Sequence, residues 1–330
     1  MKETKVLFLD QAEVARLLNY PDVVASVEKV FLSDGNGMLF VPESEHIHIG
    51  ERNLLFPMAS CLYDLGIAGV KWTNFYPQSP VGLPPCWGHI LILSSIEDGL
   101  PYAILDATNI TAYRTAGGHA VAAARRLAKP DSRVLSILGC GTQGLSAIRS
   151  FVQFFPLEEI RILTGQHSLE RVRPLLQKEL SIPVEFVSTP QELMDGADIL
   201  VTASTSQSPV ILAEHIPAGC FVAAMYAFND LDSHFAAAAD KWVIGQHSSD
   251  RREILHLPKF SGLLDEQDIY ASLGEIMTGK KPGRTSAHER ILFTHMGMGA
   301  LDIAIADDLV HKARQSGRGL ELLLNRQDTP

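Results

Sequence analysis

Two patterns of hydrophobic and polar positions divide the chain. Residues 39–105 hold short strand-like runs separated by glycine and proline, such as NLLFPM, IAGVKWTNFY, HILILSS and YAILDA. From Arg133 onward, apolar runs alternate with helical segments. The first pattern predicts an α+β domain dominated by antiparallel pairs, with a hairpin turn at residues 97–99. The second predicts a parallel, doubly wound α/β sheet.

Helices are expected near both ends of the chain. Residues 11–19, 22–33 and 297–316 have helical spacing of apolar positions, and residues 108–127 form a helix rich in small side chains. Lys129-Pro130-Asp131 then predicts a linker. We therefore expect a Rossmann domain at residues 129–301 and another domain built from both chain ends, residues 1–128 and 302–330.

A glycine-rich turn predicts a dinucleotide site. Residues 139–144 read GCGTQG, which is G-x-G-x-x-G, directly after an apolar strand and at the start of a helix. In such a turn Gly139 permits the bend, Gly141 lets a pyrophosphate approach, and Gly144 lets the helix pack on the strand. Thr142 and Gln143 open the helix, whose N–H groups and dipole favour phosphate. A glycine-rich turn of an unrelated α/β protein is the alternative.

Two later loops bear on the cofactor. An acid at the end of the second strand would hold a ribose hydroxyl and favour NAD, but the chain has TGQHS there, beginning at Thr164. Small polar residues leave room for a 2′-phosphate while supplying little positive charge, so NAD and NADP both stay open, with a slight preference for NADP. Ser204 and Thr205 follow another strand and either line the nicotinamide ribose or belong to an ordinary polar loop.

Composition excludes several classes of protein. The chain has 330 residues and a formal net charge of −10, which argues against nucleic-acid binding and an anionic membrane surface. No apolar run is long enough to span a bilayer, and the N-terminus lacks a signal-peptide pattern. The four cysteines are scattered without a CxxC or Cys/His cluster, so we expect no metal site, no disulfide and a cytoplasmic location.

Lys71 and Arg114 are the candidate substrate residues. Lys71 lies in the apolar run GVKWTNFY, as an outward edge residue or an inward functional one, and the rarity of buried lysines favours the former. Arg114 stands in a small-residue helix, where it would clamp a carboxylate or lie on the surface. Arg52 and His119 are expected to be structural or exposed, and Asp106 to end a strand or cap a helix.

Taken together, these segments resemble the ornithine cyclodeaminase/mu-crystallin family. The resemblance rests on GVKWTNFYPQSPVGLPP, ILDATNITAYRTAGGHAVAAARRLA, VLSILGCGTQGLSAIRSF, ADILVTASTSQSPVI, LGEIMTGKKPGR and THMGMGALDIAIADDL. It implies a Rossmann domain, a substrate-binding and dimerisation domain made from both chain ends, and a homodimer. It also implies that Lys71 and Arg114 bind substrate, and that Gly297 lies beside the nicotinamide of NAD(P).

Two departures from the family pattern matter. A substrate-carboxylate arginine of the family is replaced by Ser44, for which Arg52 is the candidate substitute. The aspartate that grips the distal amine of ornithine corresponds to Phe228 in our alignment, and Asp230 would replace it only in a rearranged loop. A desolvated ammonium beside an aromatic ring lacks its partner, whereas Tyr226, Phe228 and Trp72 would suit a larger or more apolar substrate if they face the pocket.

Three hypotheses about function follow. The first is an NAD(P)-dependent oxidoreductase on a small amino acid or its imine, with Lys71 stabilising charge at the reacting centre and Arg114 binding the carboxylate. The second is an ornithine cyclodeaminase that uses NAD⁺ catalytically and forms proline and ammonia. The third is a nucleotide-bound protein that binds a small ligand with little turnover.

Overall fold

The chain divides into two units. The computed structural model describes residues 3–77, 87–225, 229–257, 260 and 263–325. One unit comprises Met1–Arg114 with Met298–Pro330, and the other comprises Thr115–Gly297. The division expected from sequence differs at residues 115–128 and 298–301. The small-residue helix of the first stretch packs on helices and strands of the second unit, and the second stretch begins a helix that packs on the first unit.

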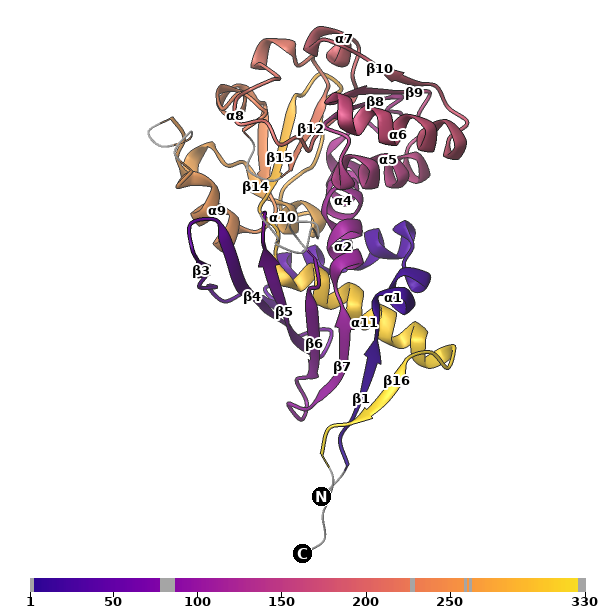
Figure 1. Ribbon diagram of the computed structural model, residues 1–330. Helices are drawn as coiled ribbons and strands as arrows, with labels where there is room; N and C mark the ends of the chain where they lie inside the picture. The colour runs from indigo at the N-terminus through magenta and orange to yellow at the C-terminus, as the bar shows by residue number, and fades with distance from the viewer. Residues whose placement is uncertain (1–2, 78–86, 226–228, 258–259, 261–262, 326–330) are drawn as a thin grey trace, which may run out of the picture. The chain divides into compact units, whose positions relative to one another are not determined.

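The first unit is built on a mostly antiparallel sheet in the order β16-β1-β7-β6-β5-β4-β2, with β3 paired to β4. The pair of β1 and β7 is parallel. The first and last strands lie side by side, so both chain ends belong to one sheet (Figure 1). The strands are β1 (Lys5–Leu9), β2 (Leu39–Phe40), β3 (Ile47–Ile49), β4 (Asn53–Leu62), β5 (Ile67–Phe75), β6 (Ile90–Ser95), β7 (Pro101–Asp106) and β16 (Leu320–Leu323).

One face of this sheet is covered by helices. The long helix α11 (Gly299–Gln315) contacts β4, β5 and β6, and also packs on α2 (Tyr20–Gly35) and α3 (Thr108–Arg114). Leu91, Leu93 and Leu105 are fully buried on the covered side. Because side chains alternate along a strand, Trp72, Ile90 and Ile92 point the other way and stay exposed. The short helix α1 (Gln11–Leu17) follows β1.

The second unit is a parallel sheet in the order β10-β9-β8-β11-β12-β15-β13-β14. Chain order reverses between β8 and β11, and a doubly wound sheet binds ligands at such a point, outside the carboxyl ends of its strands. The strands are β8 (Val134–Leu138), β9 (Glu159–Leu163), β10 (Val184–Phe186), β11 (Ile199–Thr202), β12 (Phe221–Met225), β13 (Lys241–Ile244), β14 (Ala271–Ser272) and β15 (Ile291–His295).

Helices alternate with these strands. The central strands β11, β12, β13 and β15 are buried along their whole length, as expected for strands covered on both faces. The helices are α4 (Ala120–Leu127), α5 (Thr142–Phe154), α6 (Gln166–Glu179), α7 (Pro190–Met194), α8 (His234–Ala238), α9 (His247–Leu255) and α10 (Leu273–Met277).

The α/β class and the parallel sheet are confirmed, and the local differences have physical reasons. The expected helix at residues 108–127 contains a wider π-helical turn, Thr115–His119. Strand β16 was missed because its residues, Leu320–Leu323, are all exposed and carry no alternation of burial. Cys61, Cys140 and Cys220 are free. Among the described residues, no helix combines the length and apolar character needed to cross a membrane.

Candidate functional site

The glycine-rich turn has the geometry of a dinucleotide loop. Gly139 follows β8 with φ of +84°, a backbone conformation that favours glycine. A Cβ atom at Gly139 would stand 2.6 Å from the Cα of Ser204, and one at Gly144 would stand 2.2 Å from the carbonyl oxygen of Gly139. At Gly141 an added Cβ would meet nothing within 4 Å. The turn is therefore closed on its protein side and open where a phosphate would approach.

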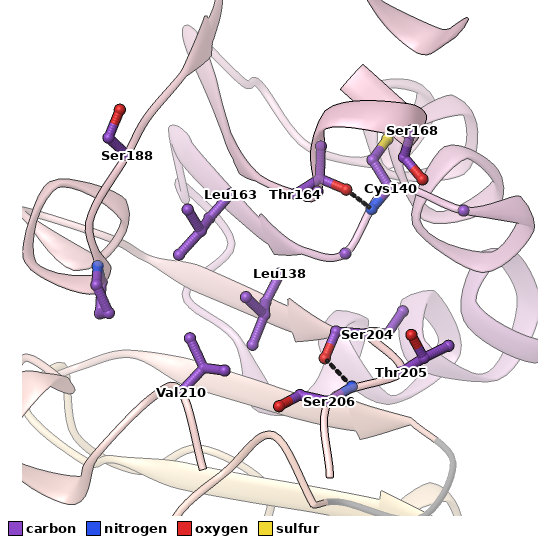
Figure 2. A pocket seen from close by; sticks show the side chains of 15 residues that line it. Leu138, Cys140, Leu163, Thr164, Ser168, Ser188, Ser204, Thr205, Ser206 and Val210 are labelled. Carbon is purple, nitrogen blue, oxygen red and sulfur yellow. Dashed lines mark hydrogen bonds between the residues drawn. The ribbon is translucent and has the colours of Figure 1, made fainter. Parts of the chain in front are cut away.

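Side chains around the turn hold it in place. Thr164 Oγ1 accepts a hydrogen bond from Cys140 N at 3.0 Å (Figure 2). Gln143 Oε1 accepts one from Ala116 N at 2.9 Å. Both side chains were predicted to bind cofactor, but each has a protein partner, so their effect on a cofactor would pass through the shape of the loop.

A pocket of about 520 Å³ opens at the carboxyl ends of β8, β9 and β11. Polar side chains from three loops surround it, together with apolar side chains that include Leu138, Leu163 and Val210 (Figure 2). Its lining includes the predicted residues Gly139, Gly141, Thr164, Ser204 and Thr205. The size and the mixed lining suit a nucleotide.

Asp230 supports the wall of this pocket. The residue is only 2% exposed. Its Oδ2 accepts hydrogen bonds from Ser204 N at 3.0 Å and from Ser204 Oγ at 2.8 Å. Ser204 Oγ in turn accepts from Ser206 N at 3.2 Å. The sequence offered Asp230 as a replacement for the family's functional aspartate; in the structure it is a buried acceptor that orients Ser204.

A buried ionic cluster lies in the first unit. Lys71, on β5, is fully buried, and its Nζ lies 2.9 Å from Asp302 Oδ1. The Oγ1 of Thr111 accepts from Lys71 Nζ at 3.2 Å and donates to Asp302 Oδ1 at the same distance. The outward orientation of Lys71 that residue statistics favoured is thus wrong, because Asp302 compensates the buried charge.

Arg114 completes the cluster from the end of α3. It is 6% exposed, and its Nε lies 3.3 Å from Asp302 Oδ2. Burial would raise the pKa of Asp302, but the charges of Arg114 and Lys71 outweigh that effect and hold the pKa below its ordinary value. Asp302 is therefore ionised at neutral pH, and two cations around one carboxylate leave a net charge of +1. A buried positive site of this kind favours a substrate carboxylate.

His89 was not recognised from sequence. It precedes β6, is 1% exposed, and its Nδ1 accepts a hydrogen bond from Asn74 N at 3.4 Å. Burial lowers the pKa of His89 to about 4, and the neighbouring charge of Lys71 adds to the effect. The imidazole is therefore neutral at pH 7. Asp302 was also missed, although a single acid in the apolar run GALDIAIA is a signal that could have identified it.

Several predicted residues lie elsewhere. Arg52 occupies the exposed turn between β3 and β4, and the contacts of the Lys71 cluster within the described residues do not include it. Ser44 Oγ donates to the carbonyl of Pro57. Gly297, with φ of +92°, follows β15 and is absent from the pocket lining. Trp72 is exposed on the face of the sheet opposite to Lys71, so it does not face a substrate held by Lys71. Tyr226 and Phe228 fall outside the described residues.

Two minor expectations are settled by contacts. Asp106 ends β7, and its Oδ1 accepts from Thr108 N at 3.0 Å, as expected for a strand end before a helix. His119 is buried, and its Nε2 lies 3.0 Å from Met225 Sδ.

Comparison with known proteins agrees with this geometry. The family model described as ornithine cyclodeaminase/mu-crystallin family matches residues 4–317. The alanine dehydrogenase of Archaeoglobus fulgidus is 28% identical over 325 residues, which cover 96% of this chain and 98% of the relative.

Solved structures give the same picture. The Δ1-pyrroline-2-carboxylate reductase of Thermococcus litoralis, in complex with NADH and L-proline, has a TM-score of 0.86 and 26% identity, covering 96% of this chain and 100% of that one. A dimer of an archaeal alanine dehydrogenase with bound NAD has a TM-score of 0.87 and 25% identity, covering 98% and 100%.

The buried cluster predicts a large effect of Asp302→Asn. Without the carboxylate, Lys71 and Arg114 become adjacent, uncompensated cations, and breaking such a buried pair costs about 3–5 kcal/mol. Urea denaturation at pH 7 should show this loss in the free energy of unfolding. Glu321→Gln, which removes an exposed pair with Lys5, is the control, with an expected loss of at most about 1 kcal/mol. A loss for Asp302→Asn as small as the control's would contradict the cluster.

His89 predicts a pH dependence of stability. An unfolded histidine binds a proton near pH 6.5 and the folded one near pH 4, so the unfolded state takes up the extra proton and stability falls as pH drops through that window. A difference of 2.5 pH units at about 1.36 kcal/mol each corresponds to a loss of about 3 kcal/mol. Urea titrations should show a flatter profile between pH 6.5 and 4 for His89→Gln than for the exposed-site control His48→Gln. Parallel profiles would argue against a buried neutral His89.

Proposed function

The chain belongs to the ornithine cyclodeaminase/mu-crystallin family, and from that premise we propose that it is an NAD(P)-dependent oxidoreductase acting on a small amino acid or its imine. The observation that carries the proposal is the buried Lys71–Asp302–Arg114 cluster, a positive site of defined geometry. The relatives named as alanine dehydrogenase and pyrroline-2-carboxylate reductase support the same reaction class.

The glycine-rich turn suits the cofactor. Its open side at Gly141, together with the first N–H groups of α5, would take the pyrophosphate. Ser204 and Thr205 line the same pocket, and Asp230 fixes the orientation of Ser204. A bound nicotinamide dinucleotide supplies or accepts the hydride, which leaves binding, orientation and electrostatics to the protein.

Arg114 and Lys71 serve the substrate. The guanidinium of Arg114 would bind the α-carboxylate, because its planar donors match a carboxylate in a bidentate pair. Lys71, held as an ammonium by Asp302 and Thr111, would place positive charge and a proton beside the nitrogen. Reduction adds a hydride to the α-carbon of the imine and a proton to its nitrogen, and oxidation of the amine reverses both transfers.

The alternative reactions are weaker on the same grounds. Cyclodeamination of ornithine needs an acid for the distal amine, and the candidate Asp230 is buried and engaged with Ser204. The position aligned with the family aspartate, Phe228, lies outside the described residues. The same cluster would also hold the carboxylate of a ligand that is not turned over, so turnover is what distinguishes a binding protein from the oxidoreductase.

Cofactor choice rests on the loop after β9. Gly165 and Ser168 line the pocket there, and no acid occurs between Thr164 and Ser168. Within this loop a 2′-phosphate would therefore meet no like charge, and α6 carries the adjacent pair Glu170 and Arg171 about one turn further along. The relatives' bound NADH and NAD favour the non-phosphorylated form. We propose that the site accepts both and uses NADP(H) at least as well as NAD(H).

Turnover tests the proposal. Purified protein is mixed with NADH or NADPH and a panel of cyclic imines and 2-oxo acid/amine mixtures, and absorbance is followed at the reduced-nicotinamide band. We expect oxidation with some members. Lys71→Met and Arg114→Ala should each lower kcat/KM about 100-fold or more, the scale seen when a preorganised electrostatic group is removed. Lys29→Met, at a half-exposed lysine of the same unit, should change it less than about twofold.

The outcomes separate the hypotheses. No oxidation despite cofactor binding would reject the oxidoreductase. Proline formation from ornithine without a net absorbance change would then identify a cyclodeaminase, and binding without either reaction would identify a binding protein. Circular dichroism of each variant shows whether a lost rate reflects lost folding.

We also propose a homodimer formed through the open face of the first unit's sheet. Phe8, Trp72, Ile90 and Ile92 expose 36%, 41%, 50% and 37% of their surface on or along that face. A contiguous apolar surface of this kind marks an interface, and a two-fold dimer buries the same patch of both copies. The archaeal relative is described as a dimer.

A charge on the open face should break the dimer. Ile90→Glu with Ile92→Glu places carboxylates in the proposed interface, where they would lack partners. Light scattering after size exclusion should show a dimer for the unchanged protein and a monomer for this variant. The control is Leu175→Glu, at an exposed leucine of α6 in the other unit, which should remain dimeric. A monomeric unchanged protein would reject this interface.

A further inference from the structure

Two polar side chains extend the ionic cluster along the covered face of the first sheet. Lys71 and Thr73 lie on the same side of β5, since Trp72 between them is exposed on the other side. The antiparallel pairing of Trp72 with Ile90 places His89 opposite Thr73. Leu91 pairs with Lys71, and His89, two residues before Leu91, lies on the same side of the sheet.

The hydroxyl of Thr73 is buried and makes no hydrogen bond to the described part of the protein. The residue is 7% exposed, and within the described part of the chain its Oγ1 has no hydrogen-bond partner. Leaving a buried hydroxyl unpaired is costly, and native proteins rarely do so without a reason. Packing alone would be served better by valine, which has the same shape. The hydroxyl therefore indicates a group that arrives with a ligand.

His89 presents one defined donor beside it. Its Nδ1 accepts from the backbone of Asn74, so the proton of the neutral ring is on Nε2. Because the pKa of His89 is about 4, this state holds throughout the physiological range. Thr73 and His89 together offer an O–H and an N–H donor next to the site for the α-carboxylate.

We propose that Thr73 and His89 form a side-chain subsite that donates hydrogen bonds to an oxygen atom of the substrate, making its substrates 2-imino or 2-amino acids that carry a hydroxyl, carbonyl or carboxylate oxygen on the side chain. An alkyl side chain would leave both donors unpaired, which a site built for hydrogen bonding rejects. A side-chain ammonium would meet an N–H donor and the charges of Lys71 and Arg114. The inference rests on the proposed function, because it specifies the substrate of the same site.

Pairs of substrates with equal shape test the subsite. Hydroxypyruvate and 2-oxobutyrate differ by hydroxyl against methyl, and oxaloacetate and 4-methyl-2-oxopentanoate by carboxylate against isopropyl. Each is assayed with ammonia and the reduced cofactor, and kcat/KM is compared within each pair. We expect the oxygen-bearing member to be preferred at least tenfold in one pair or both. The pair that shows the preference tells a neutral oxygen from a carboxylate.

Thr73→Val is the decisive variant. Removing one hydrogen bond should lower kcat/KM for the oxygen-bearing member about fivefold and leave the alkyl member within twofold. Its melting temperature should stay equal or rise, because the hydroxyl has no partner in the protein. Thr73→Ser should restore the preference. His89→Leu should act in the same direction and His89→Gln should retain part of the preference, since an amide N–H can replace Nε2–H.

Other results would overturn the subsite. Equal losses on all four acids would mean that Thr73 and His89 act on the α-carboxylate or on folding, and absence of any preference in the unchanged protein would reject the proposal outright. If no substrate turns over, the proposed function fails separately. Calorimetric binding of the four acids to the cofactor-loaded protein then decides, with selective binding lost in Thr73→Val supporting the subsite and unselective binding rejecting it.

Discussion

The carboxylate of Asp302 is the constraint on which the first unit depends. It is fully buried, it lies 2.9 Å from the ammonium of Lys71, and it faces Arg114. Either cation would be too costly to bury alone. Because Asp302 is on α11 and Lys71 is on β5, their pairing holds α11 across β5 and joins two segments that are far apart in the sequence. The same pairing leaves one positive charge over, which is the property that a carboxylate substrate requires.

In the second unit, the shape of the backbone at the glycine-rich turn determines the candidate cofactor site. Gly139 and Gly144 allow strand, turn and helix to approach at distances that no side chain would tolerate. Polar side chains then brace the turn from behind: Thr164 holds Cys140 N, and Asp230 holds Ser204. The pocket can therefore present N–H groups and small side chains to a dinucleotide, while the charged residue Asp230 is not part of its lining.

Sequence reasoning succeeded where a local signal determines structure. The glycine spacing, the strand before it and the helix after it predict the dinucleotide loop without tertiary information. It failed where the decisive partner is distant. From sequence alone Lys71 is expected to point outward, because its partner Asp302 is far along the chain. The neutral state of His89 depends on its burial and on the charge of Lys71. The sequence does not show that Asp230 pairs with Ser204, because β12 lies between them along the chain and only the pairing of β11 with β12 brings the two residues together.

On the covered face of the first sheet, a group of charged residues thus lies next to a group of uncharged polar residues. Asp302, Lys71 and Arg114 are charged and form ion pairs with one another, and in our proposal they bind the carboxylate. Beyond them, Thr73 and His89 are polar but uncharged, and the Thr73 hydroxyl lacks a protein partner. A protein selected only for stability would remove that hydroxyl, since an apolar side chain of the same shape packs equally well. If the hydroxyl is retained for recognition, the site separates the common part of an amino acid from its side chain. The residues for the two parts then meet on β5, where Lys71 and Thr73 lie two positions apart on the same side of the strand.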